Sequence, residues 1–198
     1  MSNWQQEYQD KLFSLDEALD RFIPDGTSVF CGTFEVAGGI LVPMLERIKE
    51  GRLKGIKLYG GITSEDLHLD ELKADFNALH YHNYFTGGNE RNGIASGTTS
   101  YVPLHLHRTK NLVENDGIDV AVIPMTPPDK HGYCNIGHVG CRPEGIRAAK
   151  KVIAQINPSV PYVFGLERNL HVSQIDGFVE IDQKMTQMPI ACLLYTSP

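Results

Sequence analysis

The feature that most constrains the fold of this chain is a repeated alternation of short apolar segments with segments of helical periodicity. The apolar segments are rich in β-branched and aromatic residues, and they predict strands over residues 27–31, 56–59, 79–85, 119–125 and 152–156. Glycine-containing loops follow several of these strands. Because strands that alternate with helices build parallel sheets, we predict an α/β domain with a mostly parallel sheet flanked by helices.

The segments between the predicted strands contain helix starts and stops. Ser14 and Glu17 have the spacing of a capping box, and the turn residues 24–26 end the helix that follows. We expect further helices before Ser14, over 41–48, 67–74 and 104–113, and from Pro143 onward. The segment 87–99 is rich in Gly, Asn and Ser and predicts a long loop.

The composition is that of an ordinary globular protein and excludes several classes of function. The net charge of −6 provides no basic surface for nucleic acid or for an anionic membrane. The longest apolar runs have the length of strands, so no membrane-spanning helix is expected. Four cysteines without a CxxC pair indicate reduced thiols in a cytoplasmic protein.

The chain has no internal repeat and no linker-like tract that would divide it. We therefore expect one domain over residues 1–190. The last residues, ACLLYTSP at 191–198, resemble a translated cloning adapter, and we expect them to be non-native.

Two long motifs carry a family resemblance. The first is DVAVIPMTPPDKHGYCNIG over 119–137, and the second joins KVIAQIN at 151–157 to HVSQID at 171–176. Both resemble the acetyl-CoA hydrolase/4-hydroxybutyrate CoA-transferase family, and the likeness extends from residue 4 to about residue 182. The chain departs from the family pattern at five positions: Gly38, Thr126, Asn135, Gln155 and Gln174.

The resemblance implies the amino-terminal domain of a CoA-transferase, with the fold of that family. Such an enzyme moves CoA between a short-chain acyl-CoA and a free carboxylate, of the acetate, butyrate or 4-hydroxybutyrate class, through a glutamyl-CoA thioester. The nucleophilic glutamate belongs to a carboxyl-terminal domain that these residues do not contain, so no catalytic residue is assigned here. Coenzyme A is then substrate and covalent intermediate, no metal is expected, and the full-length enzyme would be a homodimer.

Three alternatives stay open beside the transferase. An acetyl-CoA hydrolase would use the same fold with water as the final acceptor. A non-catalytic binding module would retain the fold without the chemistry. The spacing of His131, Cys134, His138 and Cys141 could hold zinc and suggest a zinc hydrolase, but it lies inside a motif that the family uses without metal.

The loop that follows the strand over 119–125 contains four candidate site residues: Pro128, Asp129, His131 and Gly132. One interpretation is a rigid turn, in which Asp129 makes an Asx turn and Gly132 takes a positive φ. The other interpretation is a loop that borders the active-site cleft, since ligands of α/β sheets bind beyond the carboxyl ends of strands. The two interpretations are compatible.

Further candidates follow earlier strands. Gly32, Gly38 and Gly39 punctuate a loop that could bring backbone N–H groups to an oxyanion or to CoA. Glu35 lies in that loop, but its position in the family argues against a nucleophilic role. Arg91 could meet a carboxylate or a CoA phosphate. The histidines at 80, 82, 105 and 107 are expected to be core or surface residues.

Overall fold

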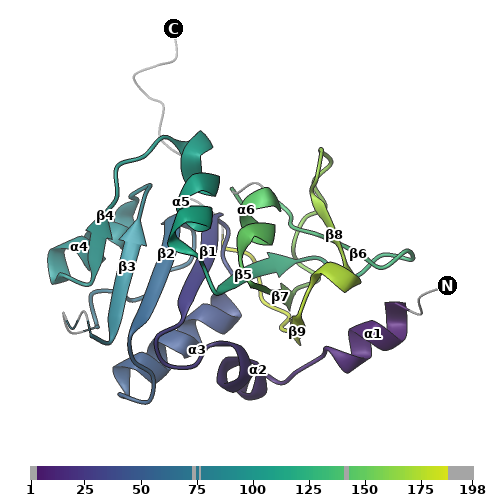
Figure 1. The fold of residues 1–198 in the computed structure, drawn as a ribbon, viewed down its shortest axis with the longest axis horizontal. Coiled ribbons are helices and arrows are strands. Elements are labelled where there is room, and N and C mark those ends of the chain that lie inside the picture. Colours follow the sequence, from purple (N-terminus) through teal and green to yellow (C-terminus); the bar gives the residue numbers. More distant parts are fainter. Residues whose placement is uncertain (1–3, 73–74, 76, 141–142, 187–198) are drawn as a thin grey trace, which may run out of the picture.

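A computed structural model describes residues 4–72, 75, 77–140 and 143–186, and it contains a seven-stranded parallel sheet (Figure 1). The strands run in the order β4-β3-β2-β1-β5-β7-β9, and each pairs with its neighbours in parallel. Their bounds are Ser28–Phe34 for β1, Ile56–Thr63 for β2, Leu79–Asn83 for β3, Thr99–Tyr101 for β4, Val120–Met125 for β5, Lys151–Ile156 for β7 and Gly177–Glu180 for β9. The predicted α/β class with a mostly parallel sheet is confirmed.

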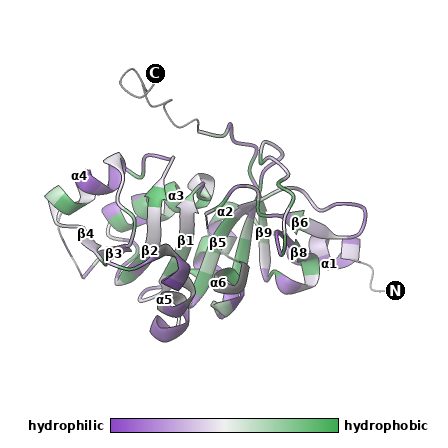
Figure 2. Ribbon diagram, turned by 90° about the horizontal axis from the view of Figure 1, so that it is seen from above, coloured by the Kyte–Doolittle hydropathy of each residue, from purple (hydrophilic) through white to green (hydrophobic). Residues whose placement is uncertain are grey.

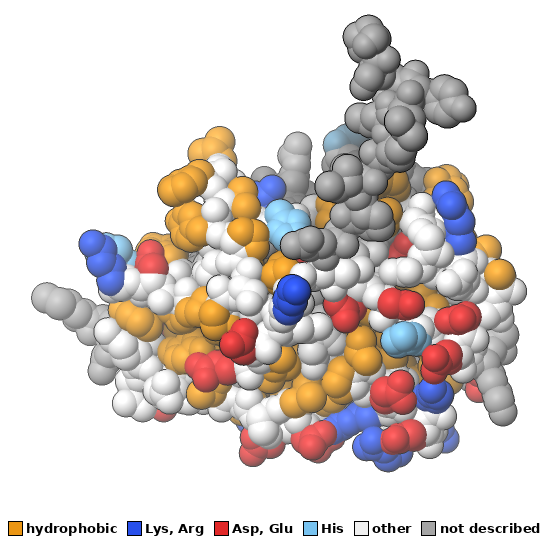
Figure 3. All heavy atoms as spheres, turned by 180° about the vertical axis from the view of Figure 1, so that it is seen from behind, with side chains coloured by type: hydrophobic (Ala, Val, Ile, Leu, Met, Phe, Trp, Pro, Cys, Tyr) orange, Lys and Arg blue, Asp and Glu red, His pale blue; other side chains and the backbone are white. Residues whose placement is uncertain are grey.

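Helices cover both faces of this sheet, as Figure 2 shows from above, with α2 and α3 on one face and α5 and α6 on the other. The α-helices are Trp4–Asp10 (α1), Leu15–Phe22 (α2), Gly38–Lys49 (α3), Gly88–Ser96 (α4), Thr109–Asp116 (α5) and Pro143–Ala148 (α6). Two 3₁₀ turns cover Leu106–Arg108 and Val172–Gln174. A separate antiparallel pair is formed by β6 (Tyr133–Asn135) and β8 (Asn169–His171). No helix in the described part of the chain is long and apolar enough to cross a bilayer. Acidic, basic and apolar side chains are interspersed on the face that Figure 3 shows.

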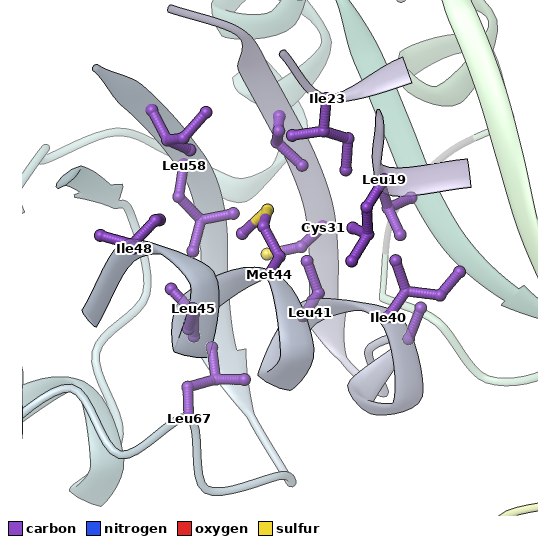
Figure 4. Close-up of a cluster of buried hydrophobic side chains, with 14 of the residues drawn as sticks. Leu19, Ile23, Cys31, Ile40, Leu41, Met44, Leu45, Ile48, Leu58 and Leu67 are labelled. Carbon is purple, nitrogen blue, oxygen red and sulfur yellow. The ribbon is translucent and has the colours of Figure 1, made fainter. Parts of the chain in front are cut away.

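The two faces of the sheet give two apolar clusters. On one face, α3 presents apolar residues at helical spacing, and Leu41, Met44 and Leu45 pack with Cys31 of β1 and Leu58 of β2 (Figure 4). On the other face, Ile146 of α6 packs with residues of β5 and β7. Because both faces are covered, the central strands are apolar almost throughout, and all six residues of β5 are buried.

Helix α2 begins with the capping box that the sequence predicts. The Ser14 hydroxyl oxygen accepts a hydrogen bond from the Glu17 backbone N–H, and the Glu17 carboxylate accepts one from the Ser14 backbone N–H at 2.9 Å. Each partner thereby satisfies a backbone donor that the first helical turn would leave unpaired.

Three segments differ from their predicted structure. β2 was expected to end before Gly60, yet it continues through both glycines, because a strand without side chains there can approach β1 closely. The segment 87–99 was expected to be a loop but contains α4, and 67–72 contains no helix. The short strands β4, β6, β8 and β9 carried no sequence signal of their own, since pairing with distant segments defines them.

Candidate functional site

The carboxyl ends of the parallel strands meet at one edge of the sheet, and a pocket opens there. Its volume is about 740 Å³, which is within the range of small-molecule sites. The residues that line it come from the ends of β1 and β2, from the segment after β6, from the segment after β7 and from the carboxyl-terminal segment: Phe34, Ser64, His138, Ser159, Pro161, Met185 and Thr186.

A buried carboxyl group stands behind the wall of this pocket. Glu35 follows β1 directly and is only 5% exposed. The Ser64 hydroxyl donates to Glu35 Oε2 at 3.2 Å, and His138 Nε2 lies 3.3 Å from the same oxygen. A carboxyl, an imidazole and a hydroxyl thus meet in one cluster, although they come from three separate segments of the chain.

The surroundings of this cluster favour the neutral forms of both titratable groups. Burial raises the pKa of Glu35 to about 7, and the charge of Glu65 adds to that rise against the opposing hydrogen bond from Ser64. Burial and the charge of Arg168 lower the pKa of His138. A neutral carboxyl can donate its proton to a neutral imidazole, so the pair is suited to share one proton near neutral pH.

The carboxyl-terminal segment runs along the same edge of the sheet and is held there by side-chain hydrogen bonds. Asn157 Nδ2 donates to the Gln183 carbonyl at 2.8 Å, and Thr186 Oγ1 donates to Glu65 Oε2 at 2.9 Å. Gln183 Nε2 also reaches Glu65 Oε1 at 3.4 Å. These contacts place Met185 and Thr186 over one side of the pocket.

The three candidate glycines lie at this edge. Gly32 has φ +81° within an irregularity of β1, a conformation that favours glycine. An added Cβ at Gly38 would lie 3.0 Å from Glu65 Cγ, and one at Gly39 would lie 2.8 Å from Ile181 Cγ2. The segments after β2 and β9 therefore pass close to the start of α3, and most closely at Gly39. Contact of these glycines with a ligand stays a prediction.

The loop after β5 forms the predicted turn. Asp129 Oδ1 accepts hydrogen bonds from the backbone N–H groups of His131 at 2.8 Å and Tyr133 at 2.9 Å, and Gly132 has φ +84°. A Cβ at Gly132 would lie 2.8 Å from Trp4 Cγ, so this loop packs against α1. Neither this turn nor Pro128 lines the pocket described above. A role for the loop in bordering a cleft with another domain stays a prediction.

Arg91 is exposed on α4, and its proposed contact with a carboxylate or a phosphate also stays a prediction. Asn89, in the same first turn of the helix, donates to the Glu65 carbonyl at 3.0 Å. The helix therefore supports the loop after β2 that carries Ser64 and Glu65.

The described members of the possible zinc set, His131, Cys134 and His138, do not form a metal site. Cys134 is fully buried, and burial raises the pKa of its thiol to about 12, whereas His138 lies beside Glu35. Cys141 lies outside the described residues. Within the part of the chain that the structure describes, no three His, Cys, Asp or Glu side chains converge in a way that could hold a metal ion.

The paired histidines lie among other side chains. The imidazole of His82 on β3 stacks on the Tyr59 ring with centroids 4.6 Å apart, and His80 Nε2 lies 2.8 Å from Ser100 Oγ. His105 is exposed and stacks on His107 at 5.5 Å. These positions agree with the expected core and surface roles.

The sequence reasoning missed the cluster of Glu35, His138 and Ser64. From the sequence alone, Glu35 is a candidate nucleophile against which its family position argues, and His138 is one of four residues whose spacing could hold zinc. A signal existed for two of the three, because Glu35 and Ser64 directly follow parallel strands and so had to reach the same edge. His138 had no such signal, since its position depends on the path of the chain after β6.

Comparisons with known proteins agree with this architecture. A sequence model of the acetyl-CoA hydrolase/transferase N-terminal domain matches residues 1–190. The succinyl-CoA:acetate/propanoyl-CoA:succinate CoA transferase of Fasciola hepatica is 31% identical over 163 residues, which are 78% of this chain and 32% of that protein. The butyryl-CoA:acetate CoA-transferase of Anaerostipes caccae is 28% identical over 185 residues, which are 90% of this chain and 40% of that protein.

Solved structures are similar over nearly the whole chain. RipA from Yersinia pestis has a TM-score of 0.85 at 25% identity, over 96% of this chain and 46% of that one. The 4-hydroxybutyrate CoA-transferase from Porphyromonas gingivalis has a TM-score of 0.66 at 22% identity, over 94% of this chain and 43% of that one, which is a likeness of fold. The chain spans about a third to two fifths of the length of the curated relatives named above. The match of the family sequence model over residues 1–190 shows that the chain belongs to the acetyl-CoA hydrolase/transferase family, to whose N-terminal domain it corresponds.

Proposed function

We propose that this chain forms one wall of the active site of a CoA-transferase that moves CoA between a short-chain acyl-CoA and a free carboxylate. The observation that supports this most is the pocket at the carboxyl edge of the sheet, where Phe34, Pro161 and Met185 provide apolar surface and His138 provides a polar group. Such a pocket is suited to a ligand with a short aliphatic chain and a carboxyl end. The CoA-transferase relatives act on ligands of that kind, as their names state.

In the proposed reaction, a glutamate of another domain attacks the thioester carbonyl of the acyl-CoA. The bond to sulfur breaks, and an acyl-glutamyl anhydride and the CoA thiolate result. The thiolate then attacks the glutamyl carbonyl of the anhydride, which releases the first acid and leaves a glutamyl-CoA thioester. A second carboxylate reverses these two steps and leaves as the new acyl-CoA. The role proposed for this chain is to hold the acyl group and exclude water, because hydrolysis of the anhydride would waste the thioester.

The wider setting follows from the same proposal. Coenzyme A is substrate and covalent intermediate, and the reaction as written uses no metal. The full-length enzyme would act as a homodimer in the cytoplasm, where the buried thiols of Cys31 and Cys134 would stay reduced.

The decisive experiment uses the full-length product of the gene that encodes this chain. The purified protein is mixed with butyryl-CoA and ¹⁴C-acetate, and labelled acetyl-CoA is separated and counted. We expect labelled acetyl-CoA from the full-length protein and none from the 198-residue chain. We also expect a protein–CoA adduct by mass spectrometry when acetate is omitted.

Other results would refute the transferase. Release of CoA without labelled acetyl-CoA would indicate an acetyl-CoA hydrolase, with water as the acceptor. A full-length protein that binds CoA without turnover would indicate a non-catalytic binding module.

A further inference from the structure

The cluster of Glu35, Ser64 and His138 at the pocket wall joins a buried acid to polar groups that a ligand can reach. Glu35 is nearly inaccessible to solvent, yet its two polar neighbours, Ser64 and His138, both line the pocket. The imidazole is half-exposed, with 46% of its side-chain surface accessible, and its Nε2 lies beside the carboxyl group. The buried acid thus orients a polar group that a ligand can reach.

The contact between the two side chains indicates which ring nitrogen is available to a ligand. His138 Nε2 faces Glu35 Oε2 at 3.3 Å. When the carboxyl is protonated and donates to Nε2, that nitrogen is an acceptor, and the proton of the neutral imidazole must then lie on Nδ1. The ring therefore has an N–H donor on the side away from Glu35, as a carboxylate ligand requires.

The rest of the pocket is suited to an aliphatic acid. Phe34, Pro161 and Met185 contribute apolar surface, and Ser159 and Thr186 contribute hydroxyls. The described residues that line the pocket include no Lys or Arg. An anionic ligand must therefore obtain its hydrogen bonds from neutral donors. The Ser64 hydroxyl already donates to Glu35, whereas the imidazole of His138 has a second ring nitrogen beside the one next to Glu35.

We propose that Glu35, His138 and Ser64 form a binding site for the carboxylate of the short-chain acid that receives CoA, with His138 as the donor and Glu35 as its positioning residue. This inference deepens the proposed function and rests on it for the identity of the acid. Among the described residues, the charged groups that act on the cluster are Glu65, which raises the pKa of Glu35, and Arg168, which lowers the pKa of His138. Arg168 donates to the Val139 carbonyl at 2.9 Å, beside His138.

The direction of the pH dependence follows from charge. Below the pKa of Glu35, about 7, the carboxyl is neutral and the pair carries no negative charge. Above that pH the ionised carboxylate repels a carboxylate ligand and no longer donates to Nε2. If only the neutral pair binds, the apparent affinity for an acid falls about tenfold between pH 6 and pH 8.

The test uses butyrate as the probe and the 198-residue chain as the protein. Butyrate is titrated at pH 6 and pH 8, while the histidine Cε1–H resonances are followed by NMR. We expect butyrate to shift the resonance of His138 and leave that of exposed His105 in place, with affinity about tenfold lower at pH 8. If butyrate shifts neither resonance, or shifts both equally, the proposal is overturned.

Two variants and a control separate the roles. His138→Gln should weaken butyrate binding at pH 6 by at least about tenfold, because the oriented donor is lost. Glu35→Gln retains a neutral partner at every pH, so its affinity should change less than about threefold between pH 6 and pH 8. His105→Gln should bind as the unmodified chain does. Full affinity in His138→Gln, or an unchanged pH dependence in Glu35→Gln, would overturn the proposal.

The butyrate-binding test and the CoA-transfer test can fail independently of each other. Butyrate binding at His138 together with a full-length protein that transfers no CoA would refute the transferase and leave the carboxylate site intact. CoA transfer by the full-length protein, with no response of His138 to butyrate, would refute the site alone.

Discussion

Burial of Glu35 makes the stability of this molecule depend on pH between pH 4.5 and about 7. Its ordinary pKa of 4.5 rises to about 7 in the folded chain, so the folded state retains a proton that the unfolded state releases. The stability associated with this proton is complete below pH 4.5 and is lost as the pH rises to about 7. His138 acts in the opposite direction, because its lowered pKa reduces stability as the pH falls below 6.5.

The substitution Glu35→Gln isolates the carboxyl contribution. We expect the free energy of unfolding of the unmodified chain to fall by about 2 kcal/mol more than that of the variant between pH 5 and pH 8. Urea unfolding at the two pH values measures this difference. Parallel pH profiles for the two proteins would show that Glu35 is ionised in the folded chain.

At the scale of elements, the contact between β1 and β2 depends on a strand that lacks side chains at its centre. An added Cβ at Gly60 would collide with Cys31 Sγ and lie 3.1 Å from the Gly32 carbonyl oxygen. Gly88, in the first turn of α4, has no atom within 4 Å of an added Cβ. Glycine is therefore required for close packing in β2, whereas the first turn of α4 has space for a side chain.

Alanine at these two positions gives a matched comparison. Gly60→Ala should lower the free energy of unfolding by about 2 kcal/mol or more, because two paired strands must separate to admit the methyl group. Gly88→Ala should leave it unchanged or raise it by less than about 1 kcal/mol, since alanine favours a helix. Urea unfolding of both variants measures the effect, and equal stabilities would contradict the strand–strand argument.

On the scale of the whole molecule, the amino-terminal segment closes an edge of the sheet. Phe13 and Phe178 of β9 are joined by a backbone hydrogen bond of 2.9 Å, and Leu12 pairs with Phe178 in parallel. The Tyr8 hydroxyl donates to Glu180 at 2.7 Å, and its ring lies 4.6 Å from that of Phe178. This covering removes an exposed strand edge that could pair with another chain.

Hydrogen exchange tests whether these distant segments open together. Tyr8→Ala removes a buried ring from this contact, so the amides of 11–13 and 177–180 should exchange faster in the same proportion. Exchange in β2 and β3 should stay unchanged. Tyr101→Ala, at an exposed tyrosine of β4, should leave 177–180 protected. Retained protection at 177–180 in Tyr8→Ala would mean that β9 is stable without the amino-terminal segment.

Local patterns predicted a large part of this structure. The capping box of α2 and the Asx turn at Asp129 depend on residues within a few positions of one another, so the sequence contained all that they need. The central strands were also predictable, because burial on both faces makes them apolar throughout. Segments without such patterns were not predictable. Helix α4 forms in a glycine-rich segment where Glu90 is fully buried and accepts hydrogen bonds from Thr63 and Gly87.

The sequence by itself determined the alternation of strands and helices, the class of sheet that this alternation builds, and the family resemblance of its two long motifs. Only the tertiary structure decided that Glu35, Ser64 and His138 meet at the wall of one pocket, and that the loop containing Asp129 packs against α1. The physical reason is the distance along the chain over which each kind of interaction acts. Periodicity and turn chemistry act between neighbours along the chain, whereas contacts such as that of Glu35 with His138 depend on strand order, register and the path of loops in space.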